Sequence, residues 1–335
     1  MNYRSLLSAA MFVAATFAAG QTVTPAVKTT PAKKAYTAPR TADGHPDLQG
    51  VWTNNTVTPF ERPKGLGAKE FYTDAELAQN QKKESDRLAL NEEEGLPTQP
   101  GTAADVHYDF AEFGLDKSQS KLVWNHRTSI IAGSEGTIPA VTPEGRARAA
   151  AIAAKDRGHE FDGPENRPFG ARCIVQNTVG PPMRPSGYNS NLQIVQGAGY
   201  MVIETEMVHD ARVVAMNGRP HLSANVRQWF GDSVGHWDGD TLVVDTTNFT
   251  DQYPFPGAQN LHVIERFTRA DDDTIIYQFT IDDPGMWTKP WSGEMPITKI
   301  KGQIYEYACH EANYGLANTL HGARVAEQEA AAQKK

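Results

Sequence analysis

Two runs rich in valine, threonine and aromatic residues flank the dipeptide Asp238-Gly239, within the stretch 229–250. An Asp-Gly pair supplies the positive φ angles that a tight two-residue hairpin turn requires. The pattern recurs, because Asn217-Gly218 follows one apolar run and Asp271 to Asp273 separates two more. Short strands joined by turn signals favour an antiparallel sheet that curls into a barrel or a sandwich.

Period-two alternation of apolar and polar residues predicts enough strands to close a barrel. We therefore predict a mainly β fold, an antiparallel β-barrel with a helical and loop insertion. The predicted strands cover residues 50–53, 121–126, 192–196, 200–206, 212–216, 225–230, 234–237, 241–247, 261–269, 274–281 and 303–309.

The chain begins with the pattern of a signal peptide. Arg4 precedes an apolar run, and the small residues Ala18 and Gly20 suit cleavage before Gln21. Residues 21–46 contain four prolines among Thr, Ala and Lys, which is typical of a disordered tether. A β-barrel domain is expected over 47–325, with the insertion at about 59–170, and a tail over 326–335.

Helices are expected in three places. Thr73-Asp74-Ala75-Glu76 has the form of a capping box and opens a helix that runs to about Glu94. Thr142-Pro143-Glu144 opens a second helix that continues to about Lys155. The Ala- and Glu-rich stretch from Leu320 predicts a helix on the surface.

Charge and hydropathy narrow the class of partner. The 335 residues carry a formal net charge of −8 without a basic patch, so a nucleic-acid partner is not expected. The apolar run of the signal peptide is too short to span a bilayer, and no later segment is longer. A small molecule is the expected partner, the expected location is the periplasm or the extracellular space, and the oligomeric state stays open.

Export changes the interpretation of the two cysteines, Cys173 and Cys309. They lack the CxxC spacing of a metal knuckle or a redox pair. In an oxidising compartment an even pair favours one structural disulfide, with two buried free thiols as the alternative.

Alternation places Glu265 on the same strand face as Val263 and Phe267, so it points into the barrel. A buried carboxylate is either paired or has a raised pKa, and both suit acid–base chemistry. Asp245 and Glu206 also lie among apolar neighbours. These three are candidate catalytic residues, and a buried ion pair that fixes the barrel is the structural alternative for Glu265.

His310 is the candidate general base, oriented by a carboxylate such as Glu306 or Glu265. The chain has no GxGxxG sequence and no P-loop, so no cofactor is expected. The alternative is a divalent metal on His209, His262 and His310, although no HExxH or HxH spacing supports it.

Further residues are candidates for substrate binding. Arg212 has a planar guanidinium suited to a carboxylate or a phenolate. Trp287 and Trp291 lie on a Pro-rich stretch and offer rings for stacking at a barrel mouth, or anchor that loop to the barrel wall. The remaining candidates are Trp229, His262, Arg266 and Tyr307.

Two resemblances follow from these motifs. Gly50-Val51-Trp52 resembles the Gly-x-Trp start of lipocalins and other calycins, in which the Trp packs against an Arg from near the C-terminus, and Arg324 is the matching residue here. The combination of Arg172-Cys173, GDSVGHWDGDTLVVDTTNF, LHVIERFTR and YEYACHEAN resembles a large family of exported bacterial proteins, most of them uncharacterised. This second resemblance implies a secreted bacterial protein and names no activity.

Together these patterns predict an exported barrel with a polar-lined cavity that acts as a cofactor-independent acid–base enzyme, a hydrolase, lyase or isomerase, on a small organic molecule. The alternative is a non-catalytic binding protein for an apolar or aromatic ligand. A third possibility is a structural or partner-binding envelope protein. An enzyme requires an inward carboxylate close to a histidine, whereas a carrier requires an almost wholly apolar cavity.

Overall fold

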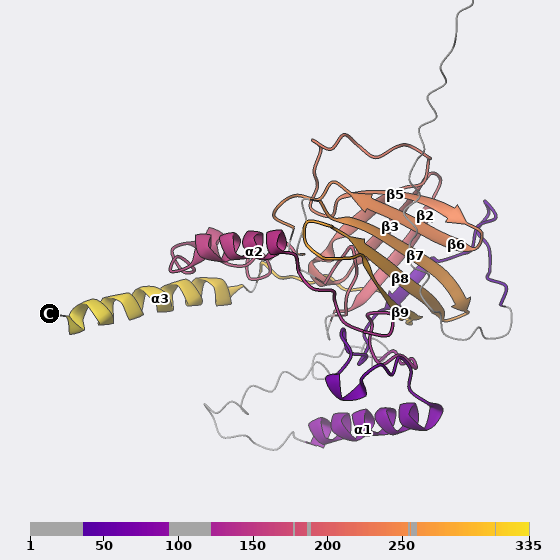
Figure 1. The fold of residues 1–335 in the computed structure, drawn as a ribbon, viewed down its shortest axis with the longest axis horizontal. Helices are drawn as coiled ribbons and strands as arrows, with labels where there is room; N and C mark the ends of the chain where they lie inside the picture. The colour runs from indigo at the N-terminus through magenta and orange to yellow at the C-terminus, as the bar shows by residue number, and fades with distance from the viewer. Residues whose placement is uncertain are drawn as a thin grey trace, which may run out of the picture.

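Nine strands of the computed structural model close into a barrel, with helices and loops outside it (Figure 1). The structure describes residues 36–93, 122–176, 178–185, 189–253, 255, 260–311 and 313–334. The mainly β barrel that the sequence predicts is confirmed. Its strands are β1 (Gly50–Thr53), β2 (Asn191–Gly197), β3 (Tyr200–Thr205), β4 (Ala211–Ala215), β5 (Asp232–Asp238), β6 (Thr241–Thr247), β7 (His262–Asp271), β8 (Thr274–Asp282) and β9 (Trp291–Lys299).

Neighbouring strands pair in antiparallel fashion around the barrel, and β1 pairs with β9 to close it. The exception is β4, which runs parallel to β5 and meets it only at Val214↔Ser233 and Ala215↔Val234. A wholly antiparallel barrel, as the sequence suggests, is therefore wrong at this seam. Residues 216–231 form the crossover that a parallel pair requires.

The two ends of the barrel differ in their connections. At one end, named here the hairpin end, two-residue turns join β2 to β3, β5 to β6 and β7 to β8. At the other end, named here the loop end, β1, β3, β6 and β8 finish and longer segments follow. The turn Glu206–Asp210 between β3 and β4 lies at the loop end and contains the short helix η5 (Met207–His209).

Side chains alternate between the interior and the outer wall as the sequence pattern predicts. On β7, Val263, Glu265 and Phe267 are fully buried, and His262 and Ile264 between them are partly exposed. The opposing rings of Phe267 and Tyr277 lie 5.0 Å apart, which is a favourable separation for an aromatic pair. The interior is thus a packed core.

Trp52 closes the hairpin end, as a Gly-x-Trp start suggests. Its Nε1 donates to Leu48 O at 3.0 Å, and the Arg269 guanidinium lies 5.3 Å from the ring centroid. The expectation that Arg324 would cover this ring is wrong. Arg324 lies on a distant helix and donates to Phe161 O, so an arginine of β7 takes the place expected for a C-terminal one.

Strand β9 was not predicted, because Gly293 and Pro296 interrupt its sequence. The structure of β9 accommodates both Gly293 and Pro296. An added Cβ at Gly293 would collide with the Phe279 ring. Glu294 N donates to Ile130 O, away from β8, and alternation directs position 296 to the same side. A proline there costs no hydrogen bond to β8.

Three predicted strands are absent from the described residues. The stretches 122–126 and 225–230 contain only isolated bridges, at Val123 and Gln228, and Lys121 lies outside the described residues. The stretch 303–309 alternates in sequence but forms no strand. A closed barrel leaves no free edge for it, and Tyr307 packs on a small cluster beside the barrel instead.

The insertion between β1 and β2 covers the outer wall at β9. Ala132 N donates to Ser292 O at 2.9 Å, which extends the sheet where β1 ends. Arg127 is buried above β9 and its Nη1 lies 3.5 Å from Glu294 Oε1. Irregular segments of the insertion thereby complete the barrel wall. Its regular elements are η1 (Lys64–Leu66), α1 (Asp74–Glu93), α2 (Pro143–Asp156) and η4 (Pro164–Asn166).

The predicted helix starts agree with the structure. Thr73 and Glu76 exchange hydrogen bonds as a capping box, and Thr142 Oγ1 accepts from Gly145 N at 2.9 Å. The C-terminal helix α3 (Tyr314–Gln333) begins six residues earlier than expected, with Asn313 as its cap. It extends beside α2 and away from the barrel (Figure 1).

The segment before the barrel is described from residue 36, so the predicted signal peptide and most of the tether lie outside the described residues. Residues 36–46 contact the barrel. Arg40 Nη2 lies 2.7 Å from Asp240 Oδ1, and His45 stacks on Trp237 at 4.9 Å. This part of the expected tether is held against the hairpin end.

Gly293→Ala tests the close approach of β9 to Phe279. We expect it to lower the free energy of unfolding by roughly 1–3 kcal/mol, because the added methyl group displaces a buried ring. Gly322→Ala on α3, where an added Cβ meets no atom within 4 Å, is the control and should not destabilise the protein. Chemical denaturation measures both, and equal effects would contradict the packing described.

Candidate functional site

Glu265 lies inside the barrel in an ion pair with Arg212. The Arg212 guanidinium on β4 makes two hydrogen bonds to the Glu265 carboxylate on β7, one of them 3.0 Å from Nη2 to Oε1. Both side chains are buried. No histidine contacts Glu265 among the described residues. The contacts are those of the buried ion pair given as the structural alternative for Glu265.

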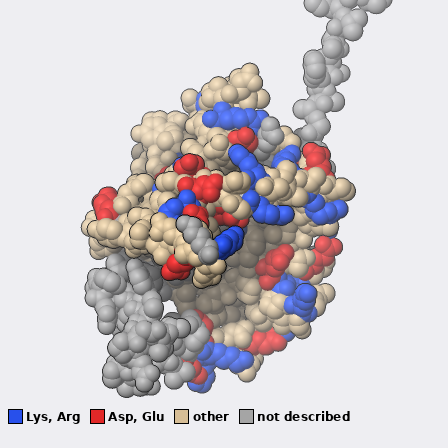
Figure 2. Space-filling model, turned by 90° about the vertical axis from the view of Figure 1, so that its left-hand side faces the viewer, with Lys and Arg blue, Asp and Glu red and all other residues tan. Residues whose placement is uncertain are grey.

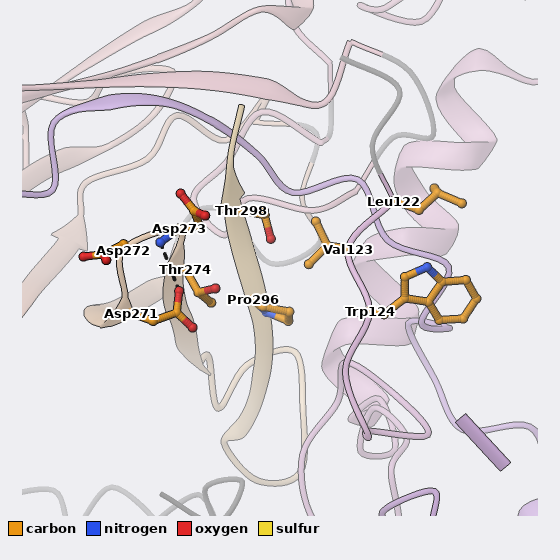
Figure 3. Close-up of a pocket in the computed structure, with 9 residues that line it drawn as sticks. All are labelled: Leu122, Val123, Trp124, Asp271, Asp272, Asp273, Thr274, Pro296 and Thr298. Carbon is orange, nitrogen blue, oxygen red and sulfur yellow. Dashed lines mark hydrogen bonds between the residues drawn. The ribbon is translucent and has the colours of Figure 1, made fainter. Parts of the chain in front are cut away.

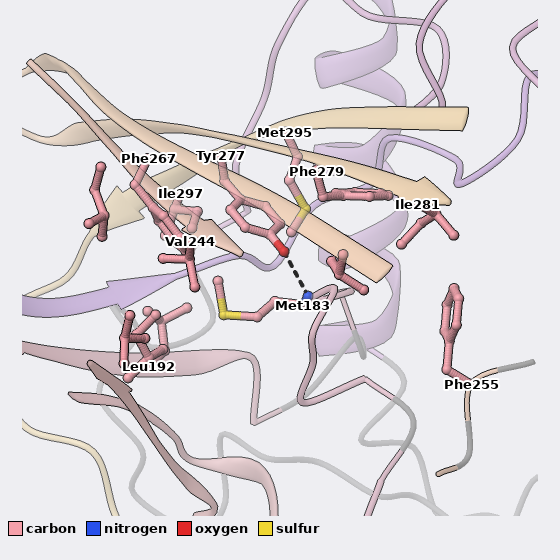
Figure 4. Packing of buried hydrophobic residues seen from close by; sticks show 14 of the residues in the cluster. Met183, Leu192, Val244, Phe255, Phe267, Tyr277, Phe279, Ile281, Met295 and Ile297 are labelled. Atoms are coloured by element: carbon pink, nitrogen blue, oxygen red, sulfur yellow. Dashed lines mark hydrogen bonds between the residues drawn. The ribbon is translucent and has the colours of Figure 1, made fainter. Parts of the chain in front are cut away.

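Tyr277 extends this pair into a network. Its hydroxyl donates to Glu265 Oε1 at 2.7 Å and accepts from Met183 N at 2.9 Å (Figure 4). Burial raises the pKa of Tyr277, and the Glu265 carboxylate raises it further. Burial opposes the charge of Arg212, but Glu265 outweighs it and the pKa of Arg212 is raised. The network joins three strands to residues 178–185.

Glu206 lies at the loop end, 3% exposed, at the start of the β3–β4 turn. Its carboxylate accepts from Asn191 Nδ2 at 2.5 Å and from Asn189 Nδ2 at 3.2 Å. Burial raises its pKa, and the amides of Asn191, Asn189 and the Tyr305 backbone partly oppose that shift. In the described part of the chain Glu206 forms no ion pair. It is a buried carboxylate held by amides alone.

Asp210 ends the same turn and directly precedes β4. Burial raises its pKa to about 6, and the nearby His209 opposes the shift. Its Oδ2 is buried without a hydrogen-bond partner among the described residues, and its backbone oxygen accepts from Thr205 N at 2.8 Å. A carboxyl that titrates near neutral pH and has one oxygen unengaged is suited to acid–base chemistry.

The backbone between these two carboxylates is strained. Val208 has φ 62° and His209 has φ 47°, in the left-handed region that a β-branched residue rarely enters. The Val208 side chain is buried against Met207, Val175 and Val179. Packing therefore holds the strain in place, as is common where a protein positions functional groups.

A small cavity adjoins the turn. It is lined by Asn54, Thr178, Val179, Met183, Arg184, Asn189, Ser190, Asn191, Leu192, Thr205 and Met207. Its volume of about 10 Å³ suffices for one water-sized occupant. Asn54 and Asn191 are each 4% exposed, and the Oδ1 of each has no hydrogen-bond partner in the described structure.

Asp245 and His262 meet on the outer wall, where His262 Nε2 lies 2.9 Å from Asp245 Oδ1. His221 Nε2, from the crossover, lies 3.2 Å from the same oxygen. Burial disfavours the charge on Asp245, but His262 and His221 outweigh it and its pKa is lowered. The hydrogen bond to Asp245 raises the pKa of His262 against the opposing effect of burial.

Asp232 anchors the other side of His221, whose Nδ1 lies 3.1 Å from Asp232 Oδ2. Arg219 makes two hydrogen bonds to Asp232, and Leu222 N donates to it at 2.9 Å. Burial works against the charge of Asp232, but these donors lower its pKa to about 2. The cluster of Arg219, His221, Asp232, Asp245 and His262, named here the outer latch, holds the crossover 216–231 to β5, β6 and β7.

The histidines proposed as metal ligands do not meet. His310 is exposed in a turn, His209 is exposed at the loop end, and His262 belongs to the outer latch. The described residues contain no group of three His, Cys, Asp or Glu side chains arranged to hold a metal ion. The expectation that His310 would follow a strand is wrong, since 303–309 forms none, and no hydrogen bond or ion pair joins His310 to Glu265 or Glu306 among the described residues.

The aromatic candidates are packed rather than open. Trp287 and Trp291 are each 5% exposed, and their rings meet edge to face at 5.6 Å. They are part of the core, which corrects their placement at an open mouth, and Trp291 begins β9. Trp229 packs on Phe169 at 5.2 Å, within the small cluster that Tyr307 also contacts. Arg266 faces outward and pairs with Asp238 at 2.8 Å.

An open cleft of about 600 Å³ lies between the insertion and the β7–β8 hairpin (Figure 3). Trp124 and Leu122 lie on one side of it, and Asp271, Asp272 and Thr274 lie on the other. No residue predicted to be functional lines this cleft.

Charge is mixed over the surface. On the described part of the face in Figure 2, acidic and basic side chains are interspersed without a broad patch of either sign. In the described part of the chain no helix is both long and apolar enough to cross a membrane.

The predicted disulfide between Cys173 and Cys309 is confirmed. It joins residues 136 positions apart and fixes the C-terminal segment beside the β3–β4 turn, where Tyr307 packs on the cluster that contains Met207 and Val208. Closing so long a loop restricts the unfolded chain, which stabilises the folded one.

Sequence analysis missed several residues of these sites. Asp210 lies in the segment 206–212, which contains four charged or titratable residues, a signal that could have selected it. Tyr277 occupies an inward position of an alternating strand, where a phenol needs a hydrogen-bond partner. His221 gave no signal, because the crossover has no periodicity, and Asp232 lies at the first residue of β5, directly after it.

Comparison of this chain with protein-family models, with curated proteins and with solved structures gives no match.

Glu265→Gln tests the ion pair inside the barrel. We expect a loss of roughly 3–5 kcal/mol in the free energy of unfolding, because Arg212 keeps a buried charge without its partner. The double variant Glu265→Leu with Arg212→Met removes both charges and should recover part of that loss. Chemical denaturation measures the two variants, and a stable Glu265→Gln protein would show that the pair does not support the fold.

Asp232→Asn tests the outer latch. We expect a loss of roughly 2–3 kcal/mol at pH 7, because a buried, hydrogen-bonded charge is removed. In the wild type the stability from Asp232 is present above about pH 4, the ordinary pKa of an aspartate, and is lost as the pH falls through about 2. Urea denaturation between pH 2 and 7 measures this slope. The exposed pair partner Asp238→Asn is the control and should change stability little.

Proposed function

We propose that this chain is an enzyme that transfers protons on a small organic molecule at the loop end of the barrel, with Asp210 as the acid–base group. One observation carries the proposal. Asp210 has a pKa of about 6, and its Oδ2 is buried without a partner among the described residues. General acid–base catalysis is most efficient when the pKa of the group lies near the working pH.

The surroundings of Asp210 support the same role. The hydroxyl of Tyr253 donates to Pro181 O at 3.3 Å, and charges on Arg212, Arg184 and Asp210 act on it. A phenol on which a carboxyl and two guanidinium groups act electrostatically is suited to bind and polarise an anionic or carbonyl substrate. Arg212 is engaged by Glu265 inside the barrel, and Arg184 lies over the rings of Phe60 and Phe255.

The strained turn gives a reason for the position of Asp210. Val208 and His209 hold left-handed φ angles, and Thr205 binds the Asp210 backbone through both its N–H and its hydroxyl. Free energy spent on such a conformation fixes a side chain that a relaxed turn would leave mobile. Hydrolysis, elimination and isomerisation each use one positioned acid–base group, and the proposal includes all three.

A second function, binding without catalysis, is favoured by the cleft of about 600 Å³. Trp124 on one side and threonine and aspartate side chains on the other suit an aromatic ligand that also carries hydrogen-bond donors (Figure 3). Trp124→Ala separates the two functions, since it should weaken such binding and leave chemistry at Asp210 unchanged.

Export to the periplasm or the extracellular space is part of the proposal. The Cys173–Cys309 disulfide supports it, because disulfides persist in oxidising compartments. The sequence pattern of a signal peptide at residues 1–20 supports it independently.

Asp210→Asn is expected to abolish turnover and to raise stability. The folded state disfavours the Asp210 carboxylate, so its cost is present above about pH 6 and absent below about pH 4. Thermal unfolding should therefore show a higher melting temperature for Asp210→Asn than for wild type at pH 8, and no gain at pH 4.

Turnover is measured on a panel of small esters, β-hydroxy acids and enolisable ketones, and the wild-type rate should change with pH near 6. Asp283→Asn is the matched control, because Asp283 is 2% exposed and has a raised pKa but follows β8, where its Oδ1 accepts from Gly285 N at 2.9 Å. It should keep activity. An active Asp210→Asn enzyme would overturn the proposal.

A further inference from the structure

The small cavity at the loop end has polar walls with unsatisfied hydrogen-bond acceptors. Asn191 Nδ2 donates to the Glu206 carboxylate, which fixes the amide so that Oδ1 points away from Glu206. That Oδ1 and the Oδ1 of Asn54 are both buried without a partner among the described residues. Buried acceptors of this kind require an occupant that donates hydrogen bonds or carries positive charge.

The charge next to the cavity selects between these occupants. Glu206 is 3% exposed and is held by the neutral N–H groups of Asn189, Asn191 and the Tyr305 backbone, with no ion pair in the described structure. A water molecule would satisfy the two amide oxygens but leave this carboxylate uncompensated. A cation satisfies both requirements.

We propose that the cavity holds one monovalent cation of water size, Na⁺, K⁺ or NH₄⁺, bound through the Oδ1 atoms of Asn54 and Asn191 and neutralised by Glu206. The volume of about 10 Å³ fits a single ion. The divalent ions Ca²⁺ and Mg²⁺ are bound in proteins mainly through carboxylates, and the Glu206 carboxylate already accepts from Asn189, Asn191 and the Tyr305 backbone.

Arg184 also lines the cavity, and its guanidinium lies over two aromatic rings. The guanidinium carbon lies 5.4 Å from the centroid of the Phe255 ring and 5.8 Å from that of Phe60. The rings attract the guanidinium, which leaves the amide oxygens as the polar groups available to an ion.

The ion would join three parts of the chain. Asn54 follows β1, Asn191 begins β2, and Glu206 begins the β3–β4 turn. A cation at this point fixes the turn that carries Asp210. The inference does not rest on the catalytic role of Asp210, and the stabilisation by cations should persist in the Asp210→Asn variant.

The test is thermal unfolding of the mature protein in NaCl, KCl, NH₄Cl and choline chloride at equal ionic strength. Choline is too large for the cavity, so it screens charge without binding there. We expect the melting temperature to be higher by about 2–4 °C in at least one of the three small cations than in choline. Equal melting temperatures in all four salts would overturn the proposal and assign the cavity to water.

Two variants locate the effect. Glu206→Gln should remove the difference between the salts, because the neutralising charge is lost. Glu294→Gln is the matched control, since Glu294 is also 3% exposed but lies beside Arg127, and the difference should remain. A difference that survives in Glu206→Gln would place the ion elsewhere. If Glu206→Gln fails to fold, anomalous scattering from Tl⁺ in wild-type crystals locates the ion. The absence of a peak between Asn54 and Asn191 would then overturn the proposal.

Discussion

The ion pair of Arg212 and Glu265 spans the interior of the barrel beside the parallel seam between β4 and β5. β4 and β5 share only two residue pairs, so few backbone hydrogen bonds close the wall between them. Arg212 extends from β4 across the interior to β7, and Tyr277 on β8 completes the network. A buried pair contributes little net stability compared with apolar packing, but it fixes which strands face one another. Here the ion pair joins β4, on one side of the parallel seam, to β7, on the other side.

The outer latch serves the same seam from outside. A parallel pair needs a crossover, and residues 216–231 cross over β5 without regular structure of their own. Asp232 and Asp245 hold this segment through His221 and Arg219. His221 and Asp232 resemble a catalytic His–Asp dyad in their contacts. Their positions around the crossover account for them as anchors, because a histidine between two carboxylates is held by charge on both sides.

The loop end combines features that a purely structural barrel would avoid. Glu206 is a buried carboxylate and Asp210 a half-buried one, neither forms an ion pair among the described residues, and Val208, with its left-handed φ angle, lies between them. Each of these costs free energy, and proteins keep such costs where they bind or transform a ligand. The proposed cation accounts for the buried amide oxygens at this end. The proposed acid–base role accounts for the carboxyl that titrates near neutral pH.

The sequence by itself determined the barrel, because alternation and Asp-Gly turns are local and depend on neighbouring residues only. It also placed Glu265 inside the barrel and paired the two cysteines. It did not determine β9, whose Gly293 and Pro296 are tolerated only because of Phe279 and an unpaired side of the strand. Nor did it determine the partners of Glu265, Asp245 and Asp210. Those contacts join residues far apart in the chain, and only the closure of the barrel, with its parallel seam, brings them together.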